Sequence, residues 1–259
     1  MRTRALTAMD IPHPAGTFAL TPASHIALQA IDSNRRNLAG TGLDWGCGSG
    51  CLAIAAATIP AVGRVVGLEI VEANIDIARS NAALNGVADK TVFMQSDSYA
   101  PFQQPDRDLL DKLAGKIAFI LANPPASGGD DGFEYRRIVL RGARRFLAAG
   151  GLVHLNISLQ YGTQRIERLT REISGFTHRG ALASTDWVPF DLQRPDLLPS
   201  LEDYAAEEAR GGMEYSFRRP APARAQKMNA RSALAHFRST GESPLSKWQV
   251  HLFEFKRQD

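Results

Sequence analysis

The residues with the clearest capacity for chemistry form a glycine-rich loop. Gly46, Gly48 and Gly50 alternate within residues 43–50, after an apolar segment and before a helix-forming run over residues 51–58. Glycine has no Cβ, so a strand that turns sharply into a helix through such a loop brings its backbone close to a bound ligand. Dinucleotide-binding proteins also use alternating glycines, so the loop alone predicts a small-molecule site without identifying the ligand.

Two further landmarks narrow the choice of ligand. Asp44 stands two positions before the first glycine, and Asn123-Pro124-Pro125 follows a later apolar segment, residues 117–122. In this order the landmarks resemble those of class I S-adenosylmethionine-dependent methyltransferases, where the glycine loop is motif I and Asn-Pro-Pro is motif IV. The resemblance implies S-adenosyl-L-methionine as the cofactor and no metal.

Acids and polar groups at later strand ends complete the expected cofactor site. Glu69 lies about 20 residues after the loop, where an acid accepts hydrogen bonds from the ribose hydroxyls. The resemblance implies that Asp97, beside Ser98, accepts from the adenine amino group. Cys47 is expected to contact the cofactor through backbone atoms and not as a reactive thiol. The predicted cofactor-binding residues are Asp44, Gly46, Cys47, Gly48, Gly50, Glu69, Ile70, Asp97, Ser98 and Asn123.

Asn123, Pro124 and Pro125 are the predicted catalytic residues. Consecutive prolines hold the backbone extended and exclude helix geometry. The Asn123 side-chain oxygen and a neighbouring proline carbonyl can then both accept hydrogen bonds from an acceptor N–H₂ group, which turns the nitrogen lone pair toward the methyl group. Methyl transfer of this kind depends chiefly on alignment and on exclusion of water.

A closer resemblance, over roughly residues 18–160, is to the release-factor glutamine methyltransferase (HemK) family. It rests on the Asn-Pro-Pro motif and on two later stretches, Gly128-Gly129-Asp130-Asp131-Gly132 and Tyr135-Arg136-Arg137-Ile138. Two departures matter. The family places an aromatic residue where this chain has Ala126, and its helical recognition domain precedes motif I, where this chain has only about 40 residues. The shared core implies methyl transfer to nitrogen, but these departures weaken the case for glutamine as the acceptor.

Strands alternate with helices along most of the chain, which predicts an α/β protein with a parallel sheet covered on both faces. The resemblance implies a doubly wound, seven-stranded Rossmann-like methyltransferase fold with strand order 3-2-1-4-5-7-6. The alternation breaks over residues 191–246, which predicts a C-terminal insertion in this fold. One helix is expected over residues 132–149, with the next strand over 152–157. The expected units are an N-terminal arm and helix (1–40), the S-adenosylmethionine-binding core (41–190), the insertion (191–246) and the last core strand (247–259).

The insertion, residues 191–246, contains prolines and two expected helices, at about 200–210 and 227–239. An insertion between the last two strands lies above the carboxyl ends of the sheet, where open α/β sheets bind ligands, so we expect a substrate-facing lid. A surface subdomain without function is the alternative. Its acids and a neighbouring tyrosine predict a surface for a cationic acceptor, unless the acids only solvate the helix: Glu202, Asp203, Tyr204, Glu207 and Glu208.

A second charged cluster lies on the helix expected after the Asn-Pro-Pro motif. Arginines recur along it opposite apolar residues, which predicts the solvated side of an amphipathic helix: Arg136, Arg137, Arg141, Arg144 and Arg145. A stripe that contacts RNA is the alternative interpretation.

Composition indicates an ordinary globular protein, with 259 residues, 22% charged residues and a net charge of +3. Cys47 and Cys51, the two cysteines, make neither a disulfide framework nor a zinc site, which favours the reducing cytoplasm. No apolar segment follows the basic first residues, so no signal peptide is expected, and the apolar run near 51–59 is too short to span a membrane.

The predicted function is therefore S-adenosylmethionine-dependent N-methylation. We expect a small-molecule acceptor, cationic or derived from an amino acid. The alternatives are a protein-glutamine N-methyltransferase, an RNA-base N-methyltransferase, and a methyltransferase-like binding module without turnover.

Overall fold

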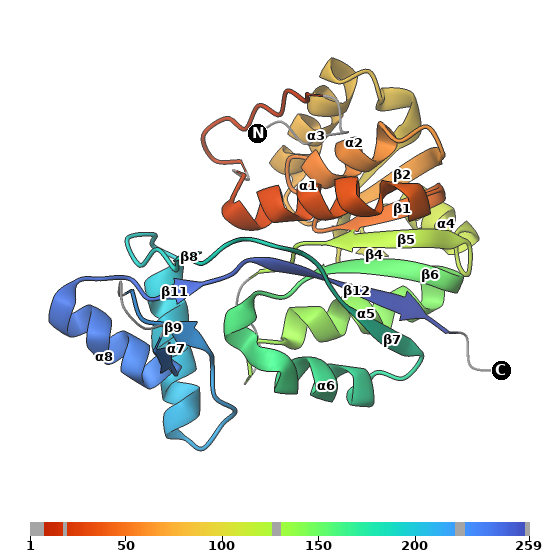
Figure 1. Ribbon diagram of the computed structural model, residues 1–259. Coiled ribbons are helices and arrows are strands. Elements are labelled where there is room, and N and C mark those ends of the chain that lie inside the picture. Colours follow the sequence, from red (N-terminus) through yellow and green to blue (C-terminus); the bar gives the residue numbers. More distant parts are fainter. Residues whose placement is uncertain (1–7, 18–19, 126–130, 221–225, 257–259) are drawn as a thin grey trace.

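The computed structural model describes residues 8–17, 20–125, 131–220 and 226–256. Figure 1 shows one large sheet between two layers of helices, with a smaller group of elements beyond one end. The described residues of the large sheet form eight strands in the order β4-β3-β2-β1-β5-β6-β12-β7. In chain order these are β1 Gly40–Trp45, β2 Val62–Glu69, β3 Thr91–Asp97, β4 Ala100–Pro101, β5 Ile117–Ala122, β6 Leu147–Asn156, β7 Phe176–Ser184 and β12 Gln249–Phe255.

Strand direction matches the predicted fold. β1 pairs in parallel with both β2 and β5, and β5 pairs in parallel with β6. β12 lies antiparallel between β6 and β7. The predicted order of seven strands is confirmed, and the two-residue β4 adds an antiparallel edge that the sequence did not indicate.

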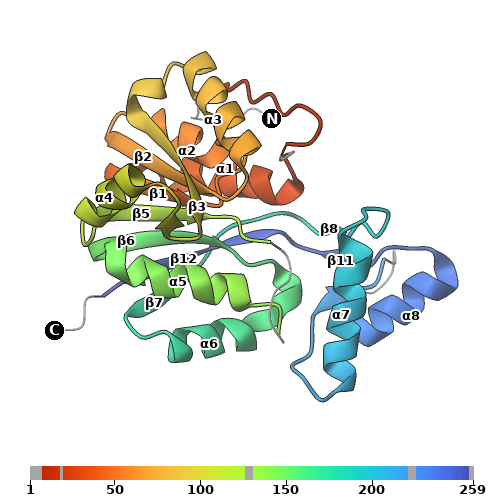
Figure 2. The ribbon, with the colours of Figure 1, turned by 180° about the vertical axis from the view of Figure 1, so that it is seen from behind.

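Helices cover both faces of the large sheet. α1, α2 and α3 lie on one side, and α5 and α6 lie on the other (Figures 1 and 2). The helices are α1 Pro22–Asn34, α2 Cys51–Ala57, α3 Glu72–Leu84, α4 Gln104–Lys112, α5 Glu134–Phe146, α6 Gly162–Glu172, α7 Leu197–Ala209 and α8 Ala230–Thr240. Short 3-10 turns follow at Arg35–Asn37, Ala88–Lys90 and Leu159–Tyr161. None of the helices in the described ranges is long and apolar enough to cross a membrane.

Local signals fix the helix ends that frame the site. Thr21 caps α1 in a reciprocal capping box with Ser24, and Pro22 occupies the first turn. α3 ends at Leu84, and Gly86 beyond it has a φ of +69°, a left-handed conformation that favours glycine.

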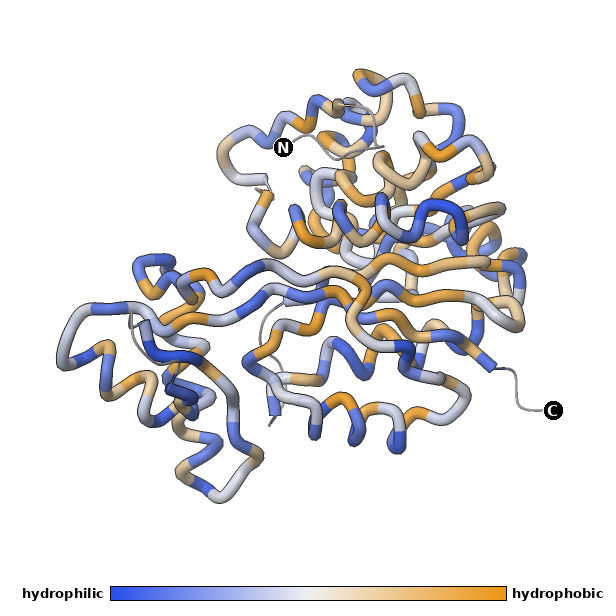
Figure 3. Tube along the Cα trace, viewed as in Figure 1, coloured by the Kyte–Doolittle hydropathy of each residue, from blue (hydrophilic) through white to orange (hydrophobic). Residues whose placement is uncertain are grey.

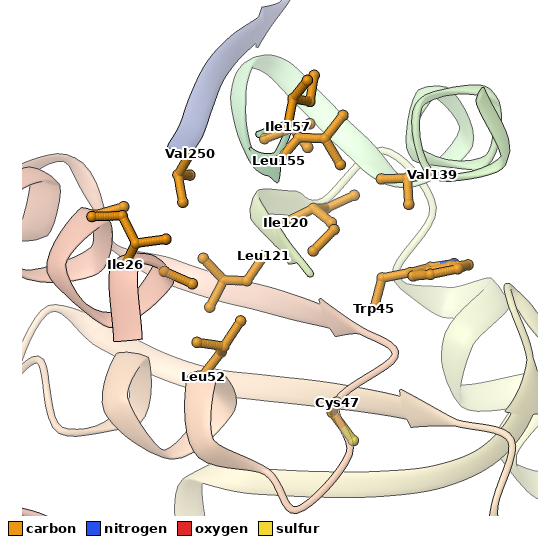
Figure 4. Packing of buried hydrophobic residues seen from close by; sticks show 14 of the residues in the cluster. Ile26, Trp45, Cys47, Leu52, Ile120, Leu121, Val139, Leu155, Ile157 and Val250 are labelled. Carbon is orange, nitrogen blue, oxygen red and sulfur yellow. The ribbon is translucent and has the colours of Figure 1, made fainter. Parts of the chain in front are cut away.

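The core lies on both faces of the central strands. In Figure 4, Leu121 of β5 points toward Ile26 of α1 and Leu52 of α2, whereas the preceding Ile120 lies on the side of Val139 of α5. Successive strand residues alternate between faces, so a strand that is apolar throughout must be covered twice. The apolar colouring of the central strands in Figure 3 follows this requirement.

The boundary after α5 differs from the prediction. The helix ends at Phe146, and β6 begins at once with Leu147, which pairs with Ile117 of β5. The helix expected to continue to residue 149 is therefore wrong. The register between β5 and β6 shifts near this point, and Gly150 has a φ of +78°. An apolar run with two glycines was interpreted as a helix stop, although it forms an irregular strand start.

A second, four-stranded sheet accompanies α7 and α8. Its strands run in the order β10-β9-β11-β8, with β8 Val188–Pro189, β9 Phe217–Arg218, β10 Lys227–Met228 and β11 Leu245–Ser246. This group connects the end of β7 to the start of β12, and Val250 near that start pairs with Asn156 at the carboxyl end of β6. The group therefore lies at the carboxyl ends of the parallel strands, as Figure 1 shows.

Candidate functional site

A cavity of about 730 Å³ opens at the carboxyl ends of the parallel strands. Its size is that of pockets that enclose small molecules or cofactors. Nine of the predicted site residues line it: Gly46, Gly48, Glu69, Ile70, Asp97, Ser98, Asn123, Pro124 and Pro125. The chain thus brings together residues from four separate strand ends at one cavity.

The glycine loop forms one wall. Gly46 and Gly48 have φ values of +66° and +52°, left-handed conformations that residues with a Cβ rarely adopt. A Cβ built on Gly46 would meet no atom within 4 Å, so open space adjoins the backbone there. The loop therefore offers main-chain surface to a ligand, as its sequence predicts.

Glu69 joins the loop to the end of β2. Its Oε2 accepts a hydrogen bond from the Gly48 amide at 2.8 Å, and its Oε1 accepts from the Val71 amide at 2.9 Å and from Asn74 Nδ2 at 3.3 Å. The side chain is buried at the cavity wall. A carboxylate has about four lone-pair sites, so acceptor capacity remains for a ligand hydroxyl.

The end of β3 supplies the next wall. Asp97 is exposed, and Ser98 has a φ of +54°, which makes it the one residue other than glycine with positive φ in the described ranges. Ser98 Oγ accepts from Trp45 Nε1 at 2.9 Å, and its carbonyl accepts from Ser96 Oγ. Ile70 leaves 55% of its surface exposed beside them. The backbone strain and an uncovered apolar residue fit a ligand-binding edge.

Asp44, Cys47 and Gly50 lie beneath the loop and do not line the cavity. Asp44 Oδ2 accepts from the Ala53 amide at 2.9 Å, which ties β1 to the first turn of α2. A Cβ on Gly50 would stand 3.0 Å from Ala78 Cβ, so this glycine permits close packing of α3. Burial raises the pKa of the Cys47 thiol well above its usual range, in agreement with a thiol that is not reactive.

The burial of Asp44 yields a pH prediction. Burial raises its pKa from 3.8 to about 7, against the Ala53 hydrogen bond, and the nearby Glu69 charge adds to the rise. The folded chain then holds this proton more tightly than the unfolded chain, so the free energy of unfolding falls as pH rises from about 4 to 7. Asp44→Asn keeps an acceptor for Ala53 and should raise stability at pH 8 by about 1–2 kcal/mol over the parent. Urea unfolding at pH 5 and pH 8 measures this, and an identical fall in both proteins would contradict the assignment.

Asn123 stands directly after β5 and is held by a residue that the sequence did not indicate. Asn156 Nδ2, at the end of β6, donates to Asn123 Oδ1 at 2.5 Å and to the Ala23 carbonyl at 3.0 Å. Because a carbonyl only accepts, this pair of bonds fixes the orientation of both amides. One lone pair of Asn123 Oδ1 remains free to accept a hydrogen bond from the N–H group of the methyl acceptor. The sequence does not single out Asn156, because one polar residue near the end of an apolar stretch is its only signal.

Arg136 and Arg137 do not belong to a solvated helix face, which corrects the prediction. Both are buried, whereas Arg141, Arg144 and Arg145 are exposed as expected. Arg137 is held by Asp131 and Glu172, and Arg136 Nη1 donates to the Pro125 carbonyl at 2.6 Å. Helical spacing alone did not show that chain segments outside the helix bury and bind two of the five arginines, Arg136 and Arg137.

The acids of the insertion also have another role than predicted. Glu207 binds the fully buried Arg165 at 2.9 Å and accepts from the Tyr215 hydroxyl, while Glu208 accepts from the amides of Tyr215 and Ala230. Glu202 pairs with Arg238 at the surface. None of the four acids lines the cavity, so the expected cation-binding surface is wrong. The insertion meets the cavity instead through Arg194, Asp196, Leu197 and Ser200.

Part of the closer resemblance cannot be placed. Ala126 and Gly128-Gly129-Asp130 lie outside the described residues. Asp131 and Gly132 are described, and a Cβ on Gly132 would lie 2.9 Å from the Tyr161 ring, which accounts for a glycine there.

Comparisons with known proteins agree with this geometry. Residues 16–127, which hold the glycine loop, Glu69, Asp97 and the Asn-Pro-Pro motif, match the family model of ribosomal protein L11 methyltransferase (PrmA). The core is that of a class I S-adenosylmethionine-dependent methyltransferase. The methyltransferase core explains why the residues at four strand ends converge on one cavity.

Curated relatives of this methyltransferase core carry two names. A release factor glutamine methyltransferase of Moorella thermoacetica is 30% identical over 150 residues, covering 54% of this chain and 53% of the relative. A ribosomal protein L11 methyltransferase of Tolumonas auensis is 41% identical over 127 residues, covering 44% and 40%. The predicted resemblance is thereby confirmed. The chain spans between 40% and 66% of the length of the first curated relatives that it matches.

Solved structures support the fold. The YcgJ protein of Bacillus subtilis superposes with a TM-score of 0.54 at 13% identity, covering 91% of this chain and all of that one. The ribosomal protein L11 methylase of Lactobacillus delbrueckii subsp. bulgaricus gives 0.50 at 23% identity, covering 65% and 76%. At these identities the likeness shows the shared α/β architecture alone.

Proposed function

We propose that this protein transfers a methyl group from S-adenosylmethionine to a nitrogen atom of a protein substrate in the cytoplasm. The observation that carries the proposal is the cavity itself, where Glu69 and the glycine loop adjoin Asn123-Pro124-Pro125. The relatives named above are methyltransferases of a release factor and of a ribosomal protein, which favours a protein acceptor over the small metabolite expected from sequence.

The described residues fit S-adenosylmethionine. The acid of Glu69 suits a ribose, the exposed Ile70 and the Asp97 carboxylate suit an adenine, and the open space at Gly46 lets the backbone approach the amino-acid part. When bound, this cofactor supplies an electrophilic methyl group on a sulfonium. Asn123 and the proline carbonyl beside it would accept from the acceptor nitrogen and aim its lone pair, and the proton that the nitrogen loses passes to water.

A small-molecule acceptor is the second candidate, because Arg194, Asp196, Leu197 and Ser200 of the insertion line the same cavity. For this candidate, residues 191–246 act as a substrate-facing lid. A protein acceptor would place a side chain in the same space.

Labelling with tritiated S-adenosylmethionine in an extract of cells that lack the gene separates the candidates. We expect label that protease digestion releases and that nuclease digestion leaves in place. Label in a filterable product that separates chromatographically from S-adenosylmethionine and its breakdown products would support the metabolite, and nuclease-sensitive label would support RNA. Tight binding of the cofactor without any labelled product would indicate a binding module and contradict the proposal.

A further inference from the structure

Arg136 is a buried cation without an acidic partner in the described residues. Only 3% of its surface is exposed. Its Nη1 donates to the carbonyls of Pro125 at 2.6 Å and Gly132 at 3.4 Å, and its Nε donates to the Asn156 carbonyl at 3.3 Å. The two other buried arginines differ, because Arg137 binds Asp131 and Glu172 and Arg165 binds Glu207.

This cation stands at the acceptor side of the cavity. Arg136 lines the cavity, and its partners Pro125 and Asn156 are, respectively, part of the Asn-Pro-Pro motif and the residue that holds Asn123. Its guanidinium carbon lies 5.0 Å from the centre of the Tyr161 ring. Its Nη2 makes no hydrogen bond within the described ranges, so two N–H donors remain. A guanidinium does not lose its proton in proteins, so these two N–H groups stay hydrogen-bond donors over the whole working range of pH.

A buried charge with only carbonyl and aromatic partners is incompletely compensated. A second cation entering the same cavity is repelled, whereas an oxygen that accepts hydrogen bonds is attracted. Resting on the proposed methyl transfer, we propose that Arg136 sets the charge class of the acceptor. Its guanidinium disfavours an ammonium group at the acceptor position, and it binds a carbonyl or carboxylate oxygen close to the nitrogen that is methylated.

This role of Arg136 distinguishes two kinds of nitrogen that a protein substrate could offer, a neutral amide and a protonated amine. A neutral amide presents both a nitrogen and an adjacent oxygen, which match Asn123 and Arg136 respectively. A protonated amine presents a positive charge and no oxygen. Arg136 therefore favours a neutral amide as the methyl acceptor, or an uncharged amine that also carries a carboxylate. This is the opposite of the cationic acceptor expected from the acids of the insertion.

The test compares S-adenosylmethionine, whose sulfonium is positive, with the neutral S-adenosylhomocysteine by calorimetry. Arg136→Gln removes the charge that repels the sulfonium. The dissociation constant for S-adenosylmethionine, divided by that for S-adenosylhomocysteine, should therefore fall by roughly threefold or more. Arg144→Gln removes an exposed charge from the same helix and should leave the ratio unchanged. An unchanged ratio in a folded Arg136→Gln protein overturns the inference. Failure of the parent protein to bind either ligand overturns the proposed function instead.

A measurement on the parent protein keeps the inference testable if Arg136→Gln does not fold. The melting temperature of the S-adenosylhomocysteine complex is followed in sodium acetate, sodium chloride and methylammonium chloride at matched ionic strength. Acetate should raise it above the chloride value, and methylammonium should not. Equal melting temperatures in acetate and chloride, or a rise in methylammonium, would contradict the assignment of Arg136.

Discussion

Asn123→Ala is expected to lower the turnover number about 100-fold on the acceptor that the labelling experiment returns, with the affinity for S-adenosylmethionine nearly unchanged. The amide at this position aims the acceptor nitrogen, and that alignment contributes to transfer rather than to cofactor binding. Loss of the side chain also removes the bond from Asn156 Nδ2, which keeps the Ala23 carbonyl as a partner. Single-turnover kinetics and calorimetry on the same preparation measure the two quantities.

Glu69→Gln serves as the reciprocal control for this experiment. It should weaken cofactor binding while the turnover per bound cofactor stays close to that of the parent. If Asn123→Ala instead loses cofactor affinity and turns over normally when saturated, Asn123 is a cofactor residue and the acceptor role is wrong.

Glu69→Ala is expected to weaken S-adenosylmethionine binding by about 1–3 kcal/mol, or roughly 5- to 150-fold in the dissociation constant. The carboxylate is placed to accept from ribose hydroxyls, and it also accepts from the Gly48 amide that shapes the loop. Both contributions are lost together. Calorimetric titration gives the dissociation constant directly.

Two variants separate the ribose contact from the loop contact. Glu69→Gln retains one oxygen for the Gly48 amide and should lie between the parent and Glu69→Ala. Glu72→Ala removes an exposed acid from the first turn of α3 and should bind like the parent. Equal affinity in Glu69→Ala and the parent would remove Glu69 from the cofactor site.

The sequence predicts the core well because local requirements and the fold agree there. Alternating glycines needed left-handed conformations, and Gly46, Gly48 and Gly50 adopt them. Continuous apolar runs needed cover on both faces, and strand β5 receives it from α1, α2 and α5. The order of the motifs along the chain then predicts which residues line the cofactor side of the cavity, because the carboxyl ends of strands in a parallel sheet meet at one edge.

The parts that the sequence did not predict depend on partners that are distant along the chain. A charge pattern on a helix does not show that Arg137 meets Glu172 or that Arg165 meets Glu207, so both sets of charges were interpreted as solvated or ligand-facing. Asn156 is 33 residues from Asn123, and only the pairing of β5 with β6 brings the two amides together. The strands of the small sheet have two residues each, too few for an alternating pattern.

A crystal structure of the complex with S-adenosylhomocysteine would show the cofactor residues and the acceptor residues of the proposed site at once. We expect ribose hydroxyls within hydrogen-bond distance of the Glu69 carboxylate, the adenine beside Ile70 and Asp97, and the sulfur atom facing Asn123. Electron density for the ligand outside this cavity, or a ribose that does not contact Glu69, would contradict the proposed site.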